Sequence, residues 1–559
     1  MVKSWLSLGE RFNVMPPEQL VAAFRPFHWR RSFYKLARIA ALIDRYGADS
    51  KTVKDRTNSI ITNYSCRNSS ETLVAEYVRL HPDNPILHEQ VIYYLQTLAI
   101  LEGAEEGPEP PDAWIVFHAL AANDYVHSWQ QPDARPLTDL ERVVGDFALV
   151  TRFNHSKDEL RFFARAASLL KGPPPHGALK DTWEDFQKLA YGMDFTTFEE
   201  TLIGPLALMS SSWGTVQTDG SIESPHVNTS EWFKQTNVPP DFGWQFFKSI
   251  SVTRAEAKAE LSKQRRPDGL PHAPTLFFRK PFVVLDDTTI VAASPTVAQQ
   301  QFSMGLWALC LQASKNRRPK DGHTLWFETF GYLVDDWCRE VAKEAEKGDF
   351  IGKVLLSKGI GTNDEIEDVI AQTSTDTALF SVKSATIPEK SVKQAQTRTD
   401  ALDWYERFLF APKTKDYRGG AIRLLNEKID KIRSGKYDSI PKDHRIFPII
   451  VTFDDLGENL PFYKWIEERC QQENLLQQDN VVPPSIASLA EYEALFGLAY
   501  HGISLFEVLG QRRELAMRYA TMKELMVPHT KERQQQRLPY LQSKFDDVYK
   551  RIKHRLFGW

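Results

Sequence analysis

Cysteine is scarce in this chain, and its few cysteines are not spaced for cross-linking or for zinc. The 559 residues include four cysteines and no Cys-x-x-Cys pair. This pattern encodes no disulfide framework and no zinc ribbon, and it is typical of proteins in a reducing compartment. The four residues are Cys66, Cys310, Cys338 and Cys470.

Long apolar runs are also missing. No stretch of the sequence approaches the roughly 18 consecutive apolar residues that a membrane-spanning helix requires. Near the N-terminus, Glu10 and Arg11 interrupt the sequence before the apolar core of a signal peptide is complete. We therefore expect a soluble, cytoplasmic protein that makes no contact with a membrane.

The chain has little excess of either charge. It contains 69 lysines and arginines and 73 acidic residues, which gives a formal net charge of -4. Such a chain is not a polycation, so contact with nucleic acid would depend on local basic patches. The composition, with 42% hydrophobic and 25% charged residues, is that of an ordinary globular protein.

Several widespread catalytic motifs are absent. The sequence contains no His-Glu-x-x-His and no Gly-x-Ser-x-Gly, so it gives no support to a zinc peptidase or a serine hydrolase. The stretch from Gly348 to Lys353 has too few residues between its glycines for a phosphate loop, and valine follows the lysine. The chemistry must therefore come from another arrangement of residues.

Helical periodicity dominates the first part of the chain. From about residue 15 to residue 215, apolar residues recur at positions i, i+3 and i+4, for example in Tyr34–Ile43 and Val91–Ile100. The character changes near residue 270, where short strand-like segments begin. We predict that residues 1–270 form a mainly helical domain for recognition, sensing or oligomerisation.

Strands and helices alternate in the rest of the chain. A β-hairpin meander is predicted within 275–293, and residues 511–559 form a basic helical extension. Alternation of this kind predicts an α/β domain with a mixed sheet flanked by helices over residues 271–510. Its main predicted strands are 350–357, 366–371, 377–384 and 446–453, and its main predicted helices are 297–313, 324–346 and 390–410.

One predicted strand ends on a lysine. In residues 376–384, period-two alternation places Ser381 and Lys383 on one face. A lysine at the end of an apolar strand either reaches solvent or faces a charged partner, because an unpaired buried ammonium is very costly. Carboxylates occur nearby in the sequence, at Asp368 upstream and at Asp400 and Asp403 downstream.

These residues resemble the site of the PD-(D/E)XK nuclease superfamily, whose fold is restriction-endonuclease-like. In that family an aspartate on one strand and an E-x-K on the next bind magnesium and position the attacking water, and a helix glutamate often assists. The resemblance implies Asp368 as the strand aspartate, Lys383 as the lysine, and Glu328 of Trp326-Phe-Glu328 as the helix glutamate. It covers roughly residues 322 to 410.

The sequence departs from the family pattern at Ser381, which replaces the usual acid. The stretch Ser381-Val-Lys383 is similar to a variant among restriction endonucleases in which the following helix supplies the missing carboxylate. By that resemblance Asp400 takes the place of the migrated acid, with Asp403 as its competitor. A catalytically inactive scaffold is the alternative, because the serine itself is not a strong metal ligand.

The predicted group suits magnesium chemistry. Mg²⁺ prefers oxygen ligands and commonly uses one or two carboxylates with waters and phosphate oxygens. Asp368 and Asp400 would bind Mg²⁺ or Mn²⁺, and Lys383 would orient the water or neutralise charge on the phosphate. Each residue also has an ordinary structural explanation. Lys383 could simply reach solvent, Asp368 could cap a turn, and Glu328 and Asp400 could be solvated helix residues.

Three segments offer basic side chains for nucleic acid. Basic and aromatic residues interleave between Phe24 and Lys35, a mixture that suits phosphate contacts and base stacking and suits an amphipathic helix equally well. The loop 315–320 and the C-terminal extension are similarly basic. The candidate contact residues are Arg30, Arg31, Lys35, Arg317, Arg318 and Arg398.

Together these patterns predict a Mg²⁺-dependent endonuclease with DNA favoured over RNA as substrate. The family resemblance implies a role in bacterial restriction or anti-phage defence, with a homo-oligomer or a defence-system protein as possible partner. An RNA-cleaving effector on the same fold and an inactive nucleic-acid-binding scaffold remain alternatives.

Overall fold

The computed structural model describes most of the chain. It covers residues 14–48, 50–62, 69–81, 84–126, 133–151, 165, 168–169, 182–190, 193, 195–235, 240–263, 265, 269–271, 276–356, 367–383, 397–414, 419–437, 439–453, 456, 459–529 and 537–557. Cys66 lies outside these residues. Within them, no helix has both the length and the apolar character needed to cross a bilayer.

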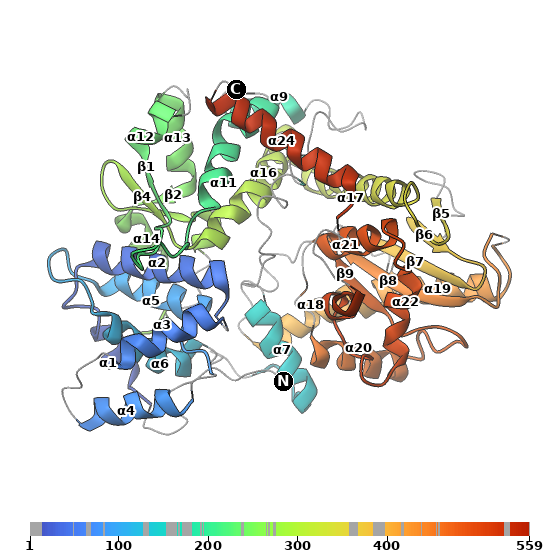
Figure 1. The fold of residues 1–559 in the computed structure, drawn as a ribbon, viewed down its shortest axis with the longest axis horizontal. Helices are drawn as coiled ribbons and strands as arrows, with labels where there is room; N and C mark the ends of the chain where they lie inside the picture. The colour runs from blue at the N-terminus through green and yellow to red at the C-terminus, as the bar shows by residue number, and fades with distance from the viewer. Residues whose placement is uncertain are drawn as a thin grey trace.

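The N-terminal part is helical, as its periodicity predicts. Its helix α7 packs against the α/β lobe, whereas α1 to α6 lie in the left-hand lobe in Figure 1. The long helices α2 and α5 run together at its centre, since α5 is buried along nearly its whole length. The elements are α1 (Pro17–Ala22), α2 (Trp29–Tyr46), α3 (Lys51–Thr62), α4 (Ser69–Leu80), α5 (Glu89–Glu102), α6 (Asp112–Val126), α7 (Asp139–Thr151), α9 (Thr182–Leu189), α10 (Phe195–Phe198), η2 (Glu199–Ile203) and α11 (Gly204–Ser210).

A small four-stranded sheet follows, with strand order β1-β4-β3-β2. It combines β1 (His226–Asn228) and β2 (Ser251–Val252) with β3 (Phe282–Val284) and β4 (Thr289–Ala292). The predicted boundary at residue 270 therefore divides a sheet, because β2 pairs with β3 across it. The helices here are α12 (Thr229–Gln235), α13 (Pro240–Ile250), α14 (Arg254–Ser262) and α15 (Leu276–Arg279). The predicted meander keeps only its β3–β4 hairpin, since residues 276–279 are helical.

The second sheet has five strands in the order β5-β6-β7-β8-β9. Its first three strands are antiparallel and its last three are parallel, so the sheet is mixed. The sequence therefore predicted the α/β class and most of the strands correctly. The strands are β5 (Lys353–Leu356), β6 (Val369–Gln372), β7 (Asp376–Lys383), β8 (Arg445–Thr452) and β9 (Ser485–Ser488).

Helices cover both faces of this sheet because both faces of its central strands are apolar. On β7, Ala378, Phe380 and Val382 belong to the core beneath α17 and α21, whereas Leu379 belongs to the core beneath α18, α19 and α20. This is the period-two alternation of a strand buried on both sides. The covering helices are α17 (Gly322–Ala345), α18 (Arg398–Phe410), α19 (Ala421–Arg433), α20 (Leu460–Gln472) and α21 (Leu489–Tyr500).

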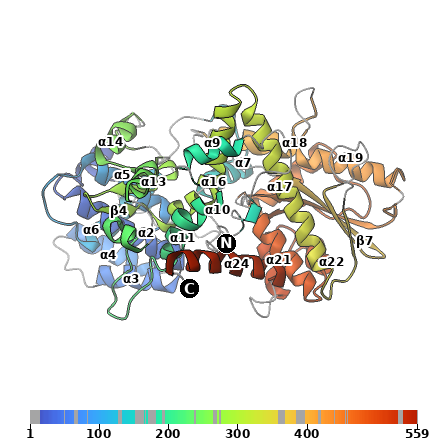
Figure 2. The same ribbon diagram turned by 90° about the horizontal axis from the view of Figure 1, so that it is seen from above.

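Two long helices link the lobes. α16 (Pro295–Arg317) leads from the small sheet to α17, and α24 (Pro539–Phe557) lies across the top of both lobes (Figures 1 and 2). The apolar face of α24 is buried, and it bonds to α17 through Lys544 and Glu340, 2.9 Å apart, and to η2 through Arg551 and Glu200, 2.7 Å apart. The C-terminal extension is thus a packed helix. Shorter elements precede it, namely α22 (Leu505–Gly510), η4 (Gln511–Arg513), α23 (Met522–Met526) and η5 (Val527–His529).

Candidate active site

Asp368 and Lys383 meet at one end of the five-stranded sheet. Asp368 directly precedes β6 and Lys383 is the last residue of β7, and these two strands are antiparallel neighbours. The backbone N–H of Val382 donates a hydrogen bond to a carboxylate oxygen of Asp368 at 2.9 Å. This bond holds Asp368 against the end of strand β7. The structure thus brings together the two residues that the strand pattern selected.

A third charged residue, Asp335, joins them from the middle of α17. Burial, reinforced by the neighbouring Asp368 carboxylate, raises the pKa of Asp335 to about 8, while Lys383 and Arg339 oppose the shift. A raised pKa in one of two neighbouring carboxyl groups is the expected result of placing like charges close together in a buried site. The site thus favours a proton or another cation between Asp335 and Asp368.

A buried ion pair lies behind this group. Glu367, only 1% exposed, is 3.1 Å from the ammonium of Lys428 on α19. Burial raises the pKa of Glu367, and Lys428 and then Lys383 counter that effect. The consecutive residues Glu367 and Asp368 therefore have different partners. Glu367 turns to Lys428, and Asp368 lies beside Asp335 and Lys383.

Ser381 occupies the position where the family pattern has an acid. Its side chain is 1% exposed, and among the described residues its hydroxyl has no hydrogen-bond partner. A buried hydroxyl without a partner costs free energy, so such a group is often explained by a ligand or by water. By the alternation of β7 this hydroxyl shares a strand face with Leu379, which lies in the core opposite α17.

Glu328, the predicted helix glutamate, is not brought to this group. Its side chain is exposed near the start of α17, seven residues before Asp335. Seven residues correspond to two helical turns, or roughly 10 Å along the axis. The two positions share a helix face, but only Asp335 reaches the sheet end, so Asp335 takes the place that the sequence assigned to Glu328.

A signal for Asp335 was present in the sequence. Asp335 stands three residues before Cys338 and seven before Ala342, and both of these are buried on α17. An acid on the same helical line as buried apolar residues is unusual, because burial of a carboxylate requires compensation. That pattern could have selected Asp335, although its partners on β6 and β7 are visible only in the fold.

Asp400 serves as a helix cap in the structure. Its side chain is exposed, and its carboxylate accepts a hydrogen bond from the backbone N–H of Thr397 at 2.9 Å, while the Thr397 hydroxyl accepts from the Asp400 N–H at 3.1 Å. This reciprocal pair is the capping box of α18. Asp403 is also exposed, and its charge acts on Arg135. The named interactions of both aspartates thus lie away from Lys383.

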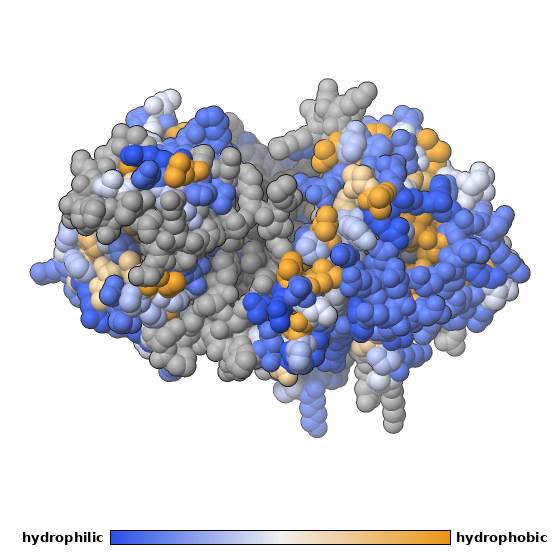
Figure 3. All heavy atoms as spheres, turned by 90° about the horizontal axis from the view of Figure 1, so that it is seen from below, coloured by the Kyte–Doolittle hydropathy of each residue, from blue (hydrophilic) through white to orange (hydrophobic). Residues whose placement is uncertain are grey.

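Three of the six proposed nucleic-acid contacts are already paired with carboxylates. Lys35 lies 2.9 Å from Glu109 and 2.7 Å from Asp112, and Arg318 lies 3.4 Å from Asp321. Arg30, Arg31 and Arg317 are exposed. Figure 3 shows hydrophilic residues over most of the α/β lobe as seen from below, with apolar residues scattered among them.

Arg398 is held by the helix that packs against it. Its backbone N–H and its guanidinium both contact Asp133, at 3.1 and 3.4 Å. Gly145 of α7 lies so close that a β-carbon there would stand 2.7 Å from the Arg398 side chain. Arg398 therefore anchors α18 to the N-terminal part. These contacts leave its guanidinium less free to bind a substrate.

The oxygen donors at the sheet end fit a hard divalent cation. Asp335 and Asp368 supply two carboxylates. Mg²⁺ commonly takes one or two carboxylates and completes its shell with water. Within the described ranges, no group of three or more histidine, cysteine or acidic residues is placed to hold a metal ion, so a closed all-protein cage of the zinc type is not found there.

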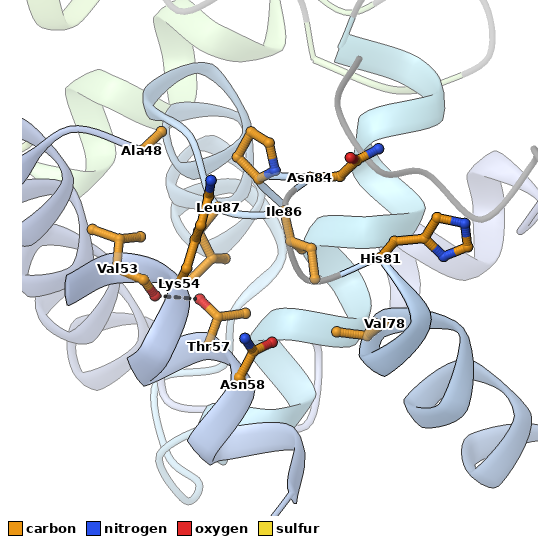
Figure 4. Close-up of a pocket in the computed structure, with 11 residues that line it drawn as sticks. Ala48, Val53, Lys54, Thr57, Asn58, Val78, His81, Asn84, Ile86 and Leu87 are labelled. Carbon is orange, nitrogen blue, oxygen red and sulfur yellow. Dashed lines mark hydrogen bonds between the residues drawn. The ribbon is translucent and has the colours of Figure 1, made fainter. Parts of the chain in front are cut away.

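A small hollow in the helical lobe is a weaker candidate. It lies between α3, α4 and the segment before α5, and Lys54, Asn58 and His81 are among the side chains around it (Figure 4). Its volume is about 10 Å³, which holds roughly one water molecule. The sheet end is thus the better candidate for chemistry.

No protein-family model, curated protein or solved structure matches the chain. The choice of the sheet end as the candidate active site therefore rests on its geometry.

Proposed function

We propose that the chain is a metal-dependent nuclease of the PD-(D/E)XK type that hydrolyses phosphodiester bonds. The observation that carries the proposal is the pair Asp335 and Asp368 beside Lys383, with the pKa of Asp335 raised to about 8. Perturbed carboxyl groups next to a lysine are characteristic of sites that bind a cation and act on an anion. The mixed sheet flanked by helices agrees with the restriction-endonuclease-like fold that the resemblance implies.

Each residue has a role that follows from its charge and position. Asp335 and Asp368 would hold Mg²⁺ or Mn²⁺. The ion would supply Lewis acidity toward a phosphate oxygen and lower the pKa of a bound water. Asp335 would release its proton when the ion binds, because a carboxyl group binds a metal in its ionised form.

Lys383 completes the arrangement on the substrate side. Its ammonium would donate hydrogen bonds to a phosphate oxygen or to the attacking water, since it stands at the end of β7 with part of its side chain exposed. Positive charge at this position stabilises the additional negative charge of the phosphorane transition state. Val382, through its N–H, keeps Asp368 aligned with this lysine.

DNA is the proposed substrate, and RNA is the second candidate because the chemistry at phosphorus is the same. The defence role and the partnership with a copy of the chain or with a defence-system protein rest on the family resemblance. An inactive nucleic-acid-binding scaffold is favoured by one observation only, the serine at position 381, which lacks the acid of the common pattern.

Cleavage assays with point variants test the proposal. Purified protein would be incubated with plasmid DNA, single-stranded DNA and structured RNA, in Mg²⁺, in Mn²⁺ and in EDTA. We expect Asp368→Ala and Lys383→Ala each to slow cleavage by about 10²–10³-fold, as for the loss of an electrostatic group in the transition state. Lys353→Ala is the matched control, since Lys353 is exposed at the opposite end of the sheet and pairs with Gln372 in the strand register.

The outcome separates the candidates. Cleavage of one substrate by the wild-type chain and by Lys353→Ala, with loss in both site variants and in EDTA, supports the nuclease and names its substrate. Cleavage that survives Asp368→Ala and Lys383→Ala would place the chemistry elsewhere. Binding of nucleic acid without cleavage under every condition would favour the inactive scaffold.

A further inference from the structure

A second cavity lies at the opposite end of the five-stranded sheet. It has a volume of about 310 Å³ and is bordered by α20, by the segment leading into β9 and by η4. The strand register places Lys383, Thr452 and Ser488 at one end of the sheet, whereas the cavity is lined by Val481, Pro483 and Pro484 just before β9. Because β7, β8 and β9 are parallel, the cavity and the candidate active site lie at different ends.

Arg512 lines this cavity and is fully buried, at 0% exposure. Its Nε donates to the Ser485 hydroxyl at 2.7 Å, and its Nη1 donates to the backbone carbonyl of Arg518 at 3.1 Å. The guanidinium also lies over the ring of Tyr463, 3.9 Å from the ring centre. All three of these partners are neutral.

The remaining nitrogen of Arg512 is without an acceptor. Among the described residues, Nη2 makes no hydrogen bond, and no carboxylate forms an ion pair with this guanidinium. Buried charges in proteins are normally paired, because removing an ion from water costs several kcal/mol. Arg512 is therefore a buried cation that has no counter-anion among the described residues.

The other charges around the cavity do not fill this gap. Glu467 is committed to Arg518, whose Nε is 2.9 Å from a Glu467 oxygen, and this pairing raises the pKa of Arg518. Arg513 is exposed beside the cavity and adds a second positive charge. The cavity thus carries a net positive charge at its wall, with the buried end formed by Arg512.

The remaining lining is mixed, with the side chains of Gln471, Gln477 and Gln478 beside apolar and aromatic ones. Ile466 and Leu476 are nearly fully buried at its wall, and Tyr519 borders it. A cavity of a few hundred Å³ that combines apolar side chains with fixed polar groups is the usual form of a small-molecule site. An occupant that suits both features carries an anionic group for the two arginines and a flat or apolar part for the rest of the wall.

We propose that this cavity binds a small organic anion, a phosphate or carboxylate attached to a ring, at the positive wall formed by Arg512 and Arg513. The anion pairs with the exposed Arg513 in the field of the buried Arg512, and the ring lies against Tyr519. Arginine donates two parallel N–H groups that match the oxygens of either anion. The proposal stands apart from the nuclease function, since the two sites share no residue.

Binding of defined probes tests this inference. Adenosine monophosphate represents a ring with a phosphate and benzoate a ring with a carboxylate, and adenosine and benzamide are their neutral counterparts. Affinity would be measured by calorimetry, and thermal stability by a melting curve, on the full chain in EDTA. We expect at least one of the two anions to bind roughly 10-fold or more tightly than its neutral counterpart, as a charge-assisted hydrogen bond to an arginine implies.

Two variants separate the pocket from general anion effects. Gln471→Trp places a large side chain at the mouth of the cavity from an exposed position of α20, and it leaves Arg512 untouched. Gln472→Trp is the matched control, since Gln472 is its exposed neighbour and does not line the cavity. We expect Gln471→Trp to weaken binding by about 10-fold or more and Gln472→Trp to leave it unchanged. Arg513→Met should abolish the preference for the anion.

The results decide the proposal and the kind of anion. Binding of only adenosine monophosphate identifies a phosphate site, and binding of only benzoate identifies a carboxylate site. The proposal is overturned if neither anion binds the wild-type chain. It is also overturned if the neutral counterparts bind equally well, or if Gln471→Trp and Gln472→Trp behave alike.

Discussion

The two ends of the five-stranded sheet carry opposite imbalances of charge. At the end where β7 finishes, two carboxylates, Asp335 and Asp368, lie beside Lys383, and the pKa of Asp335 is raised to about 8. At the end where β9 begins, the buried cation of Arg512 has only neutral partners among the residues that the structure describes. One end is thus suited to gain a cation and the other an anion.

Elsewhere in the same fold, a buried arginine is paired with a carboxylate. Arg165, 4% exposed, forms two hydrogen bonds of 2.6 and 2.7 Å to Glu493 on α21, and Trp337 donates to the same carboxylate at 2.9 Å. A buried charge with a structural role is therefore supplied with its partner from within the chain. The charges that lack one, at the two sheet ends, are the ones expected to meet a ligand.

The largest expected effect is the loss of activity on neutralising the helix carboxylate. Asp335→Asn removes one of the two charged oxygen ligands, and we expect cleavage to slow by about 10²–10³-fold. Glu328→Gln is the matched control, because Glu328 lies on the same face of α17 but is exposed two turns away. Equal losses in the two variants, or a loss confined to Glu328→Gln, would restore the glutamate that the family resemblance indicated.

The next largest effect is on stability and concerns Arg165, the buried arginine that is paired with Glu493. Arg165→Met leaves Glu493 buried without its cation, and we expect the free energy of unfolding to fall by about 3–5 kcal/mol. The double variant Arg165→Met with Glu493→Gln should recover much of that loss, since no unpaired charge remains. Urea denaturation of the three proteins measures the difference. A single variant as stable as the wild type would mean that Arg165 is not paired in solution.

A pH dependence of stability follows from the carboxylate end. In the folded chain the pKa of Asp335 is raised from 3.8 to about 8, so its favourable contribution is present below about pH 4 and is lost as the pH rises toward 8. The loss amounts to at most about 1.4 kcal/mol per pH unit. In EDTA, Asp335→Asn should therefore gain stability relative to the wild type as the pH rises from about 4 to about 8. Parallel stability curves for the two proteins would contradict the raised pKa.

Local patterns predicted the sheet and half of its candidate site. Strand β7 was recognisable because apolar residues alternate in period two up to Lys383, and Asp368 was recognisable because it stands at the entry of the neighbouring strand. Helices α16 and α17 and strand β8 also fell close to their predicted ranges. These features depend on residues near one another in sequence, which periodicity can detect.

The remaining features depend on tertiary contacts. The choice between Glu328 and Asp335 is set by where α17 crosses the sheet, and no spacing within the helix fixes that point. The boundary predicted at residue 270 falls within the four-stranded sheet, because β2 pairs with a strand beyond it. Arg512 was assigned to a basic extension, because its burial depends on Ser485 and Tyr463, which lie far away in the sequence.

The smallest expected effect concerns Asp400, whose role in the structure was visible in the sequence as Thr397-x-x-Asp400. This spacing is that of a capping box, and the structure contains both of its hydrogen bonds. Asp400→Ala should therefore lower the free energy of unfolding by about 1 kcal/mol, as the loss of a helix cap does. Cleavage by the variant should stay within about twofold of the wild type, since a cap takes no part in the transition state.

Asp403→Ala is the matched control for this last prediction, because Asp403 is exposed on the same helix and lies outside the capping box. A cap predicts a loss of stability for Asp400→Ala alone, with activity kept in both variants. A migrated catalytic acid predicts the reverse, a loss of about 100-fold in cleavage from one of them with little change in stability. The two measurements on the same pair of proteins therefore decide whether the cation at the β7 end is held by α17 or by α18.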